Sequence, residues 1–155
     1  MIRRRSRSRP VSIPQRDKKI IALAGPPGAG KTRHRLLELS DLPFLDIADI
    51  YAAHPGIEPS EALMLFQMDV EGALYEHDTL VLEAMFREGG RSRTLLEQIA
   101  HKWNAKLEIR DFNAPRKILR DRIQVQYLER YTEDPEHWKR YTEARLRLVD
   151  TFYTN

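Results

Sequence analysis

The fold of this chain is decided by the stretch from Ile20 to Thr32, which is written IIALAGPPGAGKT. Its first five residues, 20–24, are apolar and predict a strand buried on both faces, and the residues after Thr32 predict a helix. Between them lies the pattern G-x-x-x-x-G-K-T, a glycine-rich turn whose backbone N–H groups can close around a phosphate at the positive end of a helix. The predicted phosphate contacts are Gly25, Pro27, Gly28, Ala29, Gly30, Lys31 and Thr32.

Two side chains complete this predicted phosphate site. Lys31 can reach the β- and γ-phosphates, and the hydroxyl of Thr32 can ligate Mg²⁺. The alternative is a chance glycine-rich turn, but all four fixed positions of the pattern are present between a predicted strand and a predicted helix. The stretch therefore predicts binding of a nucleoside triphosphate with Mg²⁺ and leaves ATP and GTP both open.

The composition is that of one domain with a substantial core, because the chain has 155 residues. It contains no cysteine, which excludes disulfides, thiol catalysis and cysteine-ligated zinc. No apolar run approaches the length of a membrane span, and the arginine-rich start lacks the apolar stretch of a signal peptide. A cytoplasmic protein with no membrane contact is therefore expected.

The net charge of +3 is unevenly distributed along the chain. Residues 1–19 hold eight of the 26 basic residues and one of the 23 acidic residues, so they carry +7 and the remainder carries −4. We expect residues 1–17 to form a basic flexible tail and residues 18–155 to form the folded domain. The tail is either a solvated segment or an electrostatic arm for nucleic acid or another polyanion.

Strands and helices are predicted to alternate along the domain. Strands are expected at 20–24, 44–47, 79–84 and 106–112. Helices are expected after Thr32, from Ser60 to about His77, from about Ser92 to Trp103, after Pro115, and from Pro135 towards Val149 or Phe152. This order indicates an α/β sandwich around a parallel sheet, in which every strand ends at the same edge. Three acids, Asp46, Asp49 and Glu83, are expected at that edge beside the phosphate turn.

The remaining motifs favour a kinase over other phosphate-binding proteins. A GTPase should contain an Asn-Lys-x-Asp segment, which is absent, and an AAA-type motor usually ends the relevant strand in paired acids rather than in Glu83-Ala84. The Asp69-Val-Glu-Gly72 string matches a GTPase motif but falls inside a predicted helix. A short chain with a strand-end acid and an arginine-rich late helix is typical of a small kinase.

From about Lys19 to Arg130 the chain resembles the small P-loop kinases that include polynucleotide 5′-hydroxyl kinases and zeta-toxin sugar-nucleotide kinases. The resemblance rests on the phosphate turn, on Asp46-Ile-Ala-Asp49-Ile-Tyr51, on Leu82-Glu-Ala-Met-Phe-Arg87 with Arg91 close behind, and on Asn113-Ala-Pro115 followed by Arg122. It implies a P-loop NTPase-type three-layer sandwich with a central parallel sheet of about four strands and a helical lid.

The resemblance also implies roles for individual residues. Asp49 is the first choice for the base that deprotonates the acceptor hydroxyl and Asp46 the second, with a helix N-cap as the alternative role for Asp49. Lys31, Arg122 and Arg130 would supply charge to the transition state, although both arginines could instead lie on a solvated helix face. Three residues are expected at the acceptor: Glu83, Arg87 and Arg91. Glu83 could alternatively hold metal-bound water or pair with Arg87.

Three positions depart from the polynucleotide kinases. The second lid arginine is replaced by Gln126, for which Arg130 is the nearest substitute. The acceptor-phosphate arginine is replaced by Ala52, and a threonine by Met85. The leading hypothesis is an ATP-dependent kinase of polynucleotide 5′-hydroxyl groups with Mg²⁺ as cofactor. A kinase of a nucleoside or nucleotide sugar and a non-catalytic nucleotide-binding switch are the alternatives, and the oligomeric state stays open.

Overall fold

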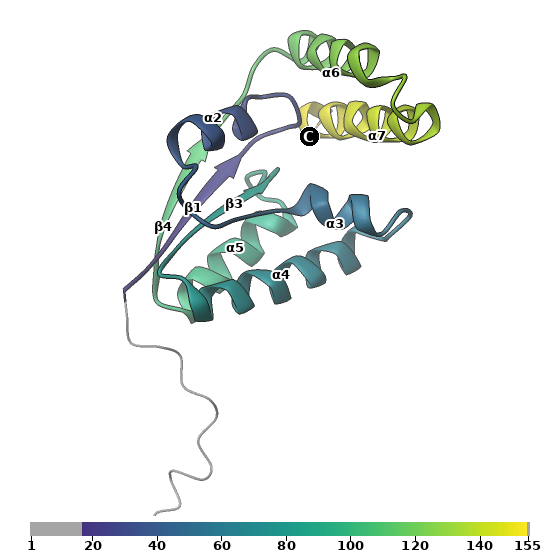
Figure 1. Cartoon of the computed structure of the whole chain (residues 1–155). Helices are drawn as coiled ribbons and strands as arrows, with labels where there is room; N and C mark the ends of the chain where they lie inside the picture. The colour runs from purple at the N-terminus through teal and green to yellow at the C-terminus, as the bar shows by residue number, and fades with distance from the viewer. Residues whose placement is uncertain (1–16, 155) are drawn as a thin grey trace, which may run out of the picture.

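A sheet of four parallel strands, in the order β2-β3-β1-β4, forms the centre of the computed structural model, which describes residues 17–154 (Figure 1). The strands are β1 (Lys18–Ala24), β2 (Phe44–Asp46), β3 (Thr79–Ala84) and β4 (Ala105–Asp111). The helices are α2 (Lys31–Glu38), α3 (Ile47–Ala53), α4 (Pro59–Glu76), α5 (Arg91–Lys102), α6 (Arg116–Arg130) and α7 (Pro135–Thr154). The basic tail predicted for residues 1–17 lies outside the described residues except for Asp17.

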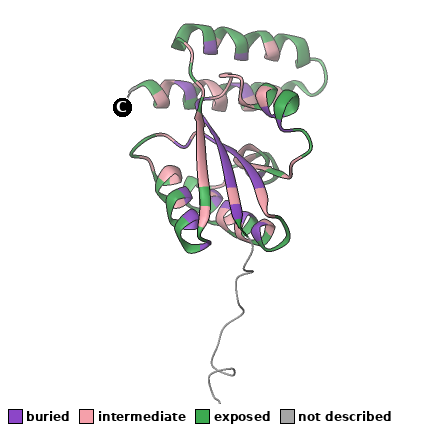
Figure 2. Ribbon diagram, turned by 90° about the vertical axis from the view of Figure 1, so that its left-hand side faces the viewer, coloured by how far each residue is buried: buried purple, intermediate pink, exposed green. Residues whose placement is uncertain are grey.

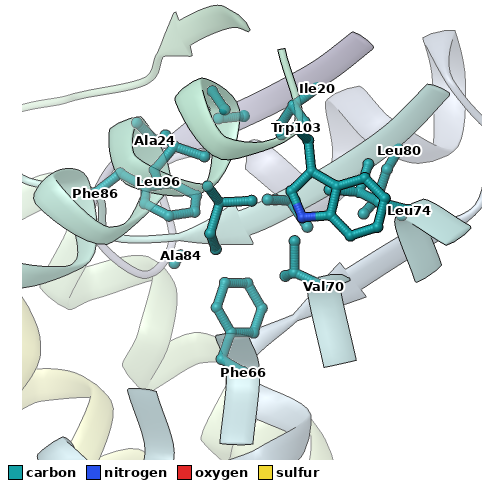
Figure 3. Close-up of a cluster of buried hydrophobic side chains, with 14 of the residues drawn as sticks. Ile20, Ala24, Phe66, Val70, Leu74, Leu80, Ala84, Phe86, Leu96 and Trp103 are labelled. Carbon is teal, nitrogen blue, oxygen red and sulfur yellow. The ribbon is translucent and has the colours of Figure 1, made fainter. Parts of the chain in front are cut away.

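The two central strands are buried on both faces, as the continuous apolar runs of β1 and β3 predicted, whereas the outer strands β2 and β4 are only partly buried. Because successive side chains of a strand point to opposite faces, Ile20 and Ala22 join the larger core, whereas Ile21 and Leu23 pack towards Leu39 at the end of α2. In the larger core, aromatic and aliphatic side chains of α4 and α5 pack on β1 and β3 (Figure 3). Figure 2 shows that purple, buried residues are concentrated in the middle of the sheet, between helices that are largely green on their outer surfaces.

The last two helices form a pair across the edge of the sheet where the strands end (Figure 1). Leu119 and Ile123 of α6 and Val149 of α7 are buried together and contact Ala29 of the phosphate turn. Both Arg116 and Arg120 bind the carboxylate of Asp150, which joins the start of α6 to the end of α7. These features confirm the predicted three-layer sandwich of the P-loop NTPase type with a parallel sheet and a helical lid.

Several predicted boundaries were wrong. The second strand ends at Asp46, and a helix that was not predicted, α3, begins at Ile47, because Asp46 accepts a hydrogen bond from the N–H of Ala48 at 2.9 Å and caps the helix. Asp49 therefore lies in the first turn of α3 and not at a strand end. The helix predicted from Ser60 begins at Pro59, because proline suits a first helical position.

Among residues 17–154, no helix is both long enough and apolar enough to cross a membrane.

Candidate functional site

The phosphate turn connects β1 to α2 at the edge where the parallel strands end. Gly25, Gly28 and Gly30 have φ values of +149°, +83° and +102°, a region that glycine adopts without steric cost. Gly30 is the N-cap of α2 and leaves the first N–H groups of that helix without a side-chain cap. Free N–H groups at the start of a helix, together with the helix dipole, are features with which proteins bind anions, so the geometry is compatible with the predicted phosphate site.

Position 25 needs glycine for two reasons: its positive φ, and the closeness of another backbone segment, which leaves no room for a side chain. A Cβ atom at this position would lie 2.1 Å from the carbonyl oxygen of Phe112, which follows β4. The N–H of Gly25 also donates to the carbonyl of Met85 at 3.0 Å. The turn is therefore held between the ends of β3 and β4, which fixes its position relative to the rest of the edge.

Replacing Gly25 by alanine is expected to lower the free energy of unfolding by about 2–6 kcal/mol, since the added Cβ would meet a backbone oxygen and would strain the positive φ. The matched control is Gly72→Ala inside α4, where nothing lies within 4 Å of the added atom and where alanine should stabilise the helix by about 0.5–1 kcal/mol. Urea unfolding of both variants measures the difference. Equal stabilities of the two variants would contradict this account of Gly25.

Lys31 is folded across the turn towards the sheet. Its Nζ atom donates to the carbonyl oxygens of Gly25 and of Ala84, the latter at 3.3 Å. Burial lowers the pKa of the Lys31 amine to about 8, and the nearby carboxylates of Asp46 and Glu83 oppose that change. Two carbonyl oxygens replace the lost hydration of this partly buried ammonium less well than anionic oxygens, such as those of a phosphate, would.

Glu83 lies at the end of β3 and is only 1% exposed. One carboxylate oxygen accepts a hydrogen bond from the hydroxyl of Thr32 at 3.0 Å, and the other accepts one from the buried guanidinium of Arg35. Arg35 also covers the ring of Phe44, with 3.5 Å between the guanidinium carbon and the ring centroid. Glu83 thus pairs with Arg35 rather than with Arg87, and its carboxylate orients the hydroxyl of Thr32.

These donors fit the way in which proteins hold Mg²⁺ at a nucleotide. Among the described residues, no group of three or more acids or histidines could hold a metal ion alone. Mg²⁺ commonly takes one or two protein oxygens together with water and the phosphates of its nucleotide. Thr32, whose hydroxyl is held by Glu83, is the residue at the turn that could provide one such oxygen.

Asp46 and Asp49 line one cavity of about 220 Å³ beside the phosphate turn. Burial raises the pKa of Asp46, and the charges of Glu83 and Asp49 raise it further, while the hydrogen bond from Ala48 and the charge of Lys31 lower it. Asp49 is exposed in the first turn of α3. The full lining is Leu45, Asp46, Asp49, Ile50, Ala53, His54, Phe66 and Asp69.

The two lid arginines predicted from the sequence lie in different places. Arg122 donates from Nη1 to the carbonyl oxygen of Gly28 at 3.0 Å, so α6 places it directly on the phosphate turn. Arg130 lies at the other end of α6, with its Nη1 4.0 Å from a carboxylate oxygen of Glu133 and its guanidinium carbon 5.6 Å from the ring centroid of Trp138. The structure brings Arg122, and not Arg130, to the turn.

Arg87 and Arg91 follow β3, as predicted, and have separate neighbours. Arg87 donates from Nη1 to the carbonyl of Thr151 in α7 at 3.4 Å. Arg91 begins α5 and lies near Tyr51 of α3, where its charge counteracts the burial that raises the pKa of the phenol. Arg91 is therefore near the helix that carries Asp49, whereas Arg87 lies against the lid.

A second hollow of about 260 Å³ lies beside α2, on the side of the turn that faces β4. His34 and Phe112 line it with their ring centroids 5.1 Å apart. The remaining lining residues are Ala29, Gly30, Arg33, Leu37 and Glu38. This hollow therefore adjoins the turn on the side of β4, whereas Asp46 ends β2 at the other side of the sheet.

Sequence reasoning missed two charged residues close to the turn. Arg35 could have been found, because it follows Thr32 by three positions and therefore lies on the same side of α2, towards Glu83. Arg145 of α7 binds the side chain of Gln126, and its positive charge acts on Lys31. No local pattern marks Arg145, since only the pairing of α6 with α7 brings it there.

Comparison with known proteins supports the fold but gives no family. No family model matches the chain, and no curated protein matches it. A solved structure of a protein from Chloroflexus aurantiacus J-10-fl, described as a "putative kinase", is similar with a TM-score of 0.57 and 18% sequence identity. The match covers 81% of this chain and 75% of that protein. At this identity the likeness shows a shared fold.

Proposed function

We propose that this protein is an ATP-dependent phosphotransferase that moves the γ-phosphoryl group of ATP to an alcohol acceptor with Mg²⁺. One observation carries the proposal: Arg122 of the lid contacts the phosphate turn at Gly28, and Lys31 of the same turn lies close enough to Asp46 of the cavity for their charges to interact. A phosphate cradle opposite a carboxylate is what phosphoryl transfer to a hydroxyl needs, because the reaction depends on charge neutralisation and on alignment of the acceptor. The fold shared with the Chloroflexus protein agrees with this proposal.

In this proposal, Lys31 leaves its carbonyl partners to contact the β- and γ-phosphate oxygens. The hydroxyl of Thr32, oriented by Glu83, is the protein ligand of Mg²⁺. When bound, Mg²⁺ neutralises charge on the phosphate oxygens. Arg122 contributes a cation from the opposite side of the turn. The nucleoside occupies the hollow between α2 and Phe112.

Asp46 is the stronger candidate for the base, which reverses the order expected from the sequence. Its charge and that of Lys31 act on each other, which supports a position near the terminal phosphate, and its pKa is raised. A carboxylate with a raised pKa accepts a proton from the acceptor more readily. Only one oxygen of Asp46 caps α3, so the other is available to the acceptor hydroxyl. Asp49 then acts in acceptor binding.

The residues that line the acceptor cavity suit a small alcohol better than the 5′ end of a polynucleotide. Its described lining includes Asp46, Asp49 and Asp69 and contains no lysine or arginine, so it would repel the phosphates beside a 5′-hydroxyl. The polynucleotide 5′-hydroxyl acceptor stays a second candidate, because Arg91 lies near Tyr51 of α3 and could contact a phosphate at the rim of the cavity.

An acceptor panel tests the proposed function. We expect label from γ-labelled ATP and Mg²⁺ to appear on at least one alcohol among nucleosides, sugars, nucleotide sugars and oligonucleotides with 5′-hydroxyl ends. Label on small alcohols alone would support the acidic cavity as the acceptor site. Label on oligonucleotides alone would restore the polynucleotide assignment. Binding of ATP without label on any acceptor would favour the nucleotide-binding switch.

The pH dependence of ATP binding should report Lys31 directly. The pKa of about 8 applies without ligand, and phosphate oxygens raise it, so binding above this pH must take up a proton. Affinity should therefore be level below pH 8 and fall by about 10-fold per pH unit above it, until the pKa of the bound state is reached. Calorimetric titration at pH 7, 8 and 9 measures this. Lys31→Arg is the control, because a guanidinium stays charged; a wild-type profile as flat as that control would contradict the assignment.

A further inference from the structure

The pair of lid helices contacts the phosphate turn more closely than Arg122 alone would require. Leu119, Ile123 and Val149 are at most 1% exposed and pack against Ala29 of the turn. A Cβ atom at Gly28 would lie 3.4 Å from the carbonyl oxygen of Leu119 and 3.5 Å from Cγ1 of Ile123. Side chains on this face of α6 and α7 therefore reach the space above the turn.

Arg145 lies on this face. It precedes Val149 by four positions, so the two side chains share one side of α7, and Leu146 beside it contacts the same cluster. Its Nη1 donates to Oε1 of Gln126 on α6, and Gln126 follows Arg122 by one helical turn. Since Arg122 binds the carbonyl of Gly28, the guanidinium of Arg145 is held one turn along α6 from a group that contacts the phosphate turn.

Most arginines of α6 and α7 form an ion pair with a carboxylate, and Arg145 differs from them in this respect. Arg116 and Arg120 bind Asp150, while Arg130 and Arg140 have carboxylates of Glu133 and Glu136 at 4.0 and 3.9 Å. In the part of the chain that the structure describes, the arginines of α6 and α7 that make no ion pair with a carboxylate are Arg122, Arg145 and Arg147.

Of these three, Arg147 is exposed on α7. Arg145 instead lies close enough to Lys31 to lower the pKa of its amine. Three cations that repel one another, Lys31, Arg122 and Arg145, therefore gather at the turn. Such a group is favourable when it receives an anion that all three contact.

We propose that Arg145 contacts the terminal phosphate of the bound triphosphate and that Gln126 positions it there. This inference rests on the proposed function and assigns to α7 a role that the sequence assigned to Arg130. A planar guanidinium can give two parallel hydrogen bonds to phosphate oxygens, so it suits the charge that spreads over the transferred group. The protein would then have all of its contacts to the terminal phosphate only when α7 is packed on α6.

The test compares affinities for a triphosphate and a diphosphate in the presence of Mg²⁺. Arg145→Ala should weaken binding of the β,γ-imido analogue of ATP by about 10- to 100-fold, because a charged hydrogen bond to the terminal phosphate is lost. Binding of ADP should change by less than about 2-fold, since ADP lacks that phosphate. Gln126→Ala keeps the guanidinium but removes its support, so a smaller loss confined to the triphosphate is expected. Arg147→Ala is the matched control and should leave both affinities unchanged.

Each other outcome overturns the inference. Equal losses for the two nucleotides in Arg145→Ala would mean that Arg145 only maintains the packing of α7. The same holds if neither affinity changes, or if the loss confined to the triphosphate appears in Arg130→Ala instead. Should Arg145→Ala not fold, Arg145→Lys and Gln126→Ala give the same comparison. A wild-type protein that binds neither nucleotide would refute the proposed function itself, which is a distinguishable result.

Discussion

Replacing Lys31 by methionine is expected to reduce phosphoryl transfer from ATP by about 10²- to 10³-fold or more. The loss follows because Lys31 is the partly buried cation that would meet the charge developing on the β- and γ-phosphates, and a preorganised group of this kind contributes on that scale. The initial rate of label transfer, or of phosphate release to water before an acceptor is known, measures it.

The free energy of unfolding of Lys31→Met shows whether the lower rate comes from the lost charge or from an unfolded protein. Burial disfavours the charged form of Lys31, and its pKa of about 8 records that cost. Methionine removes the buried charge and keeps most of the volume, so the free energy of unfolding should not fall. Lys139→Met on the exposed side of α7 is the control and should transfer phosphate at the wild-type rate. Full activity of Lys31→Met would contradict the proposed phosphate site.

Replacing Asp46 by asparagine should reduce phosphoryl transfer by about 10²- to 10⁴-fold, the range for removal of a general base. Asparagine keeps an oxygen that can accept the hydrogen bond from Ala48, so α3 should still begin at Ile47. ATP affinity should therefore change little while the turnover number falls. Rates measured at saturating ATP and acceptor separate these two effects.

The same experiment decides between the two acids. Asp49→Asn should cause a smaller loss in turnover and a larger change in acceptor KM, since Asp49 is exposed in the cavity lining. Asp41→Asn, in an exposed turn, serves as the control. Turnover of the wild-type protein should also rise with pH on the acid side, as Asp46, whose pKa is raised, loses its proton. A larger turnover loss in Asp49→Asn than in Asp46→Asn would restore the order expected from the sequence.

The fold could be predicted well because its signals are local. The apolar runs of β1 and β3 and the glycine pattern between Gly25 and Lys31 each specify a structure within a few residues. Helix α3 was missed because the segment after Asp46 resembles the continuation of a strand, and a single cap at Asp46 ends the strand instead.

The candidate site was less accessible to sequence reasoning wherever it depends on contacts between distant segments. The motif at Glu83 indicated a strand-end acid but not that its partner would be Arg35, which lies 48 positions earlier in the chain. The family resemblance at Asn113-Ala-Pro115 indicated Arg122 as a residue of the helix that follows, and α6 carries it. It could not indicate Arg145, whose place depends on how α7 packs against α6. The roles of all these residues stay predictions until variants are measured.

The most direct test of the central claim is a crystal structure with the β,γ-imido analogue of ATP and Mg²⁺. We expect the β-phosphate within the turn from Gly25 to Thr32, with the Nζ atom of Lys31 moved from the carbonyls of Gly25 and Ala84 to phosphate oxygens. A nucleotide bound elsewhere, with Lys31 still held by those two carbonyls, would contradict the account.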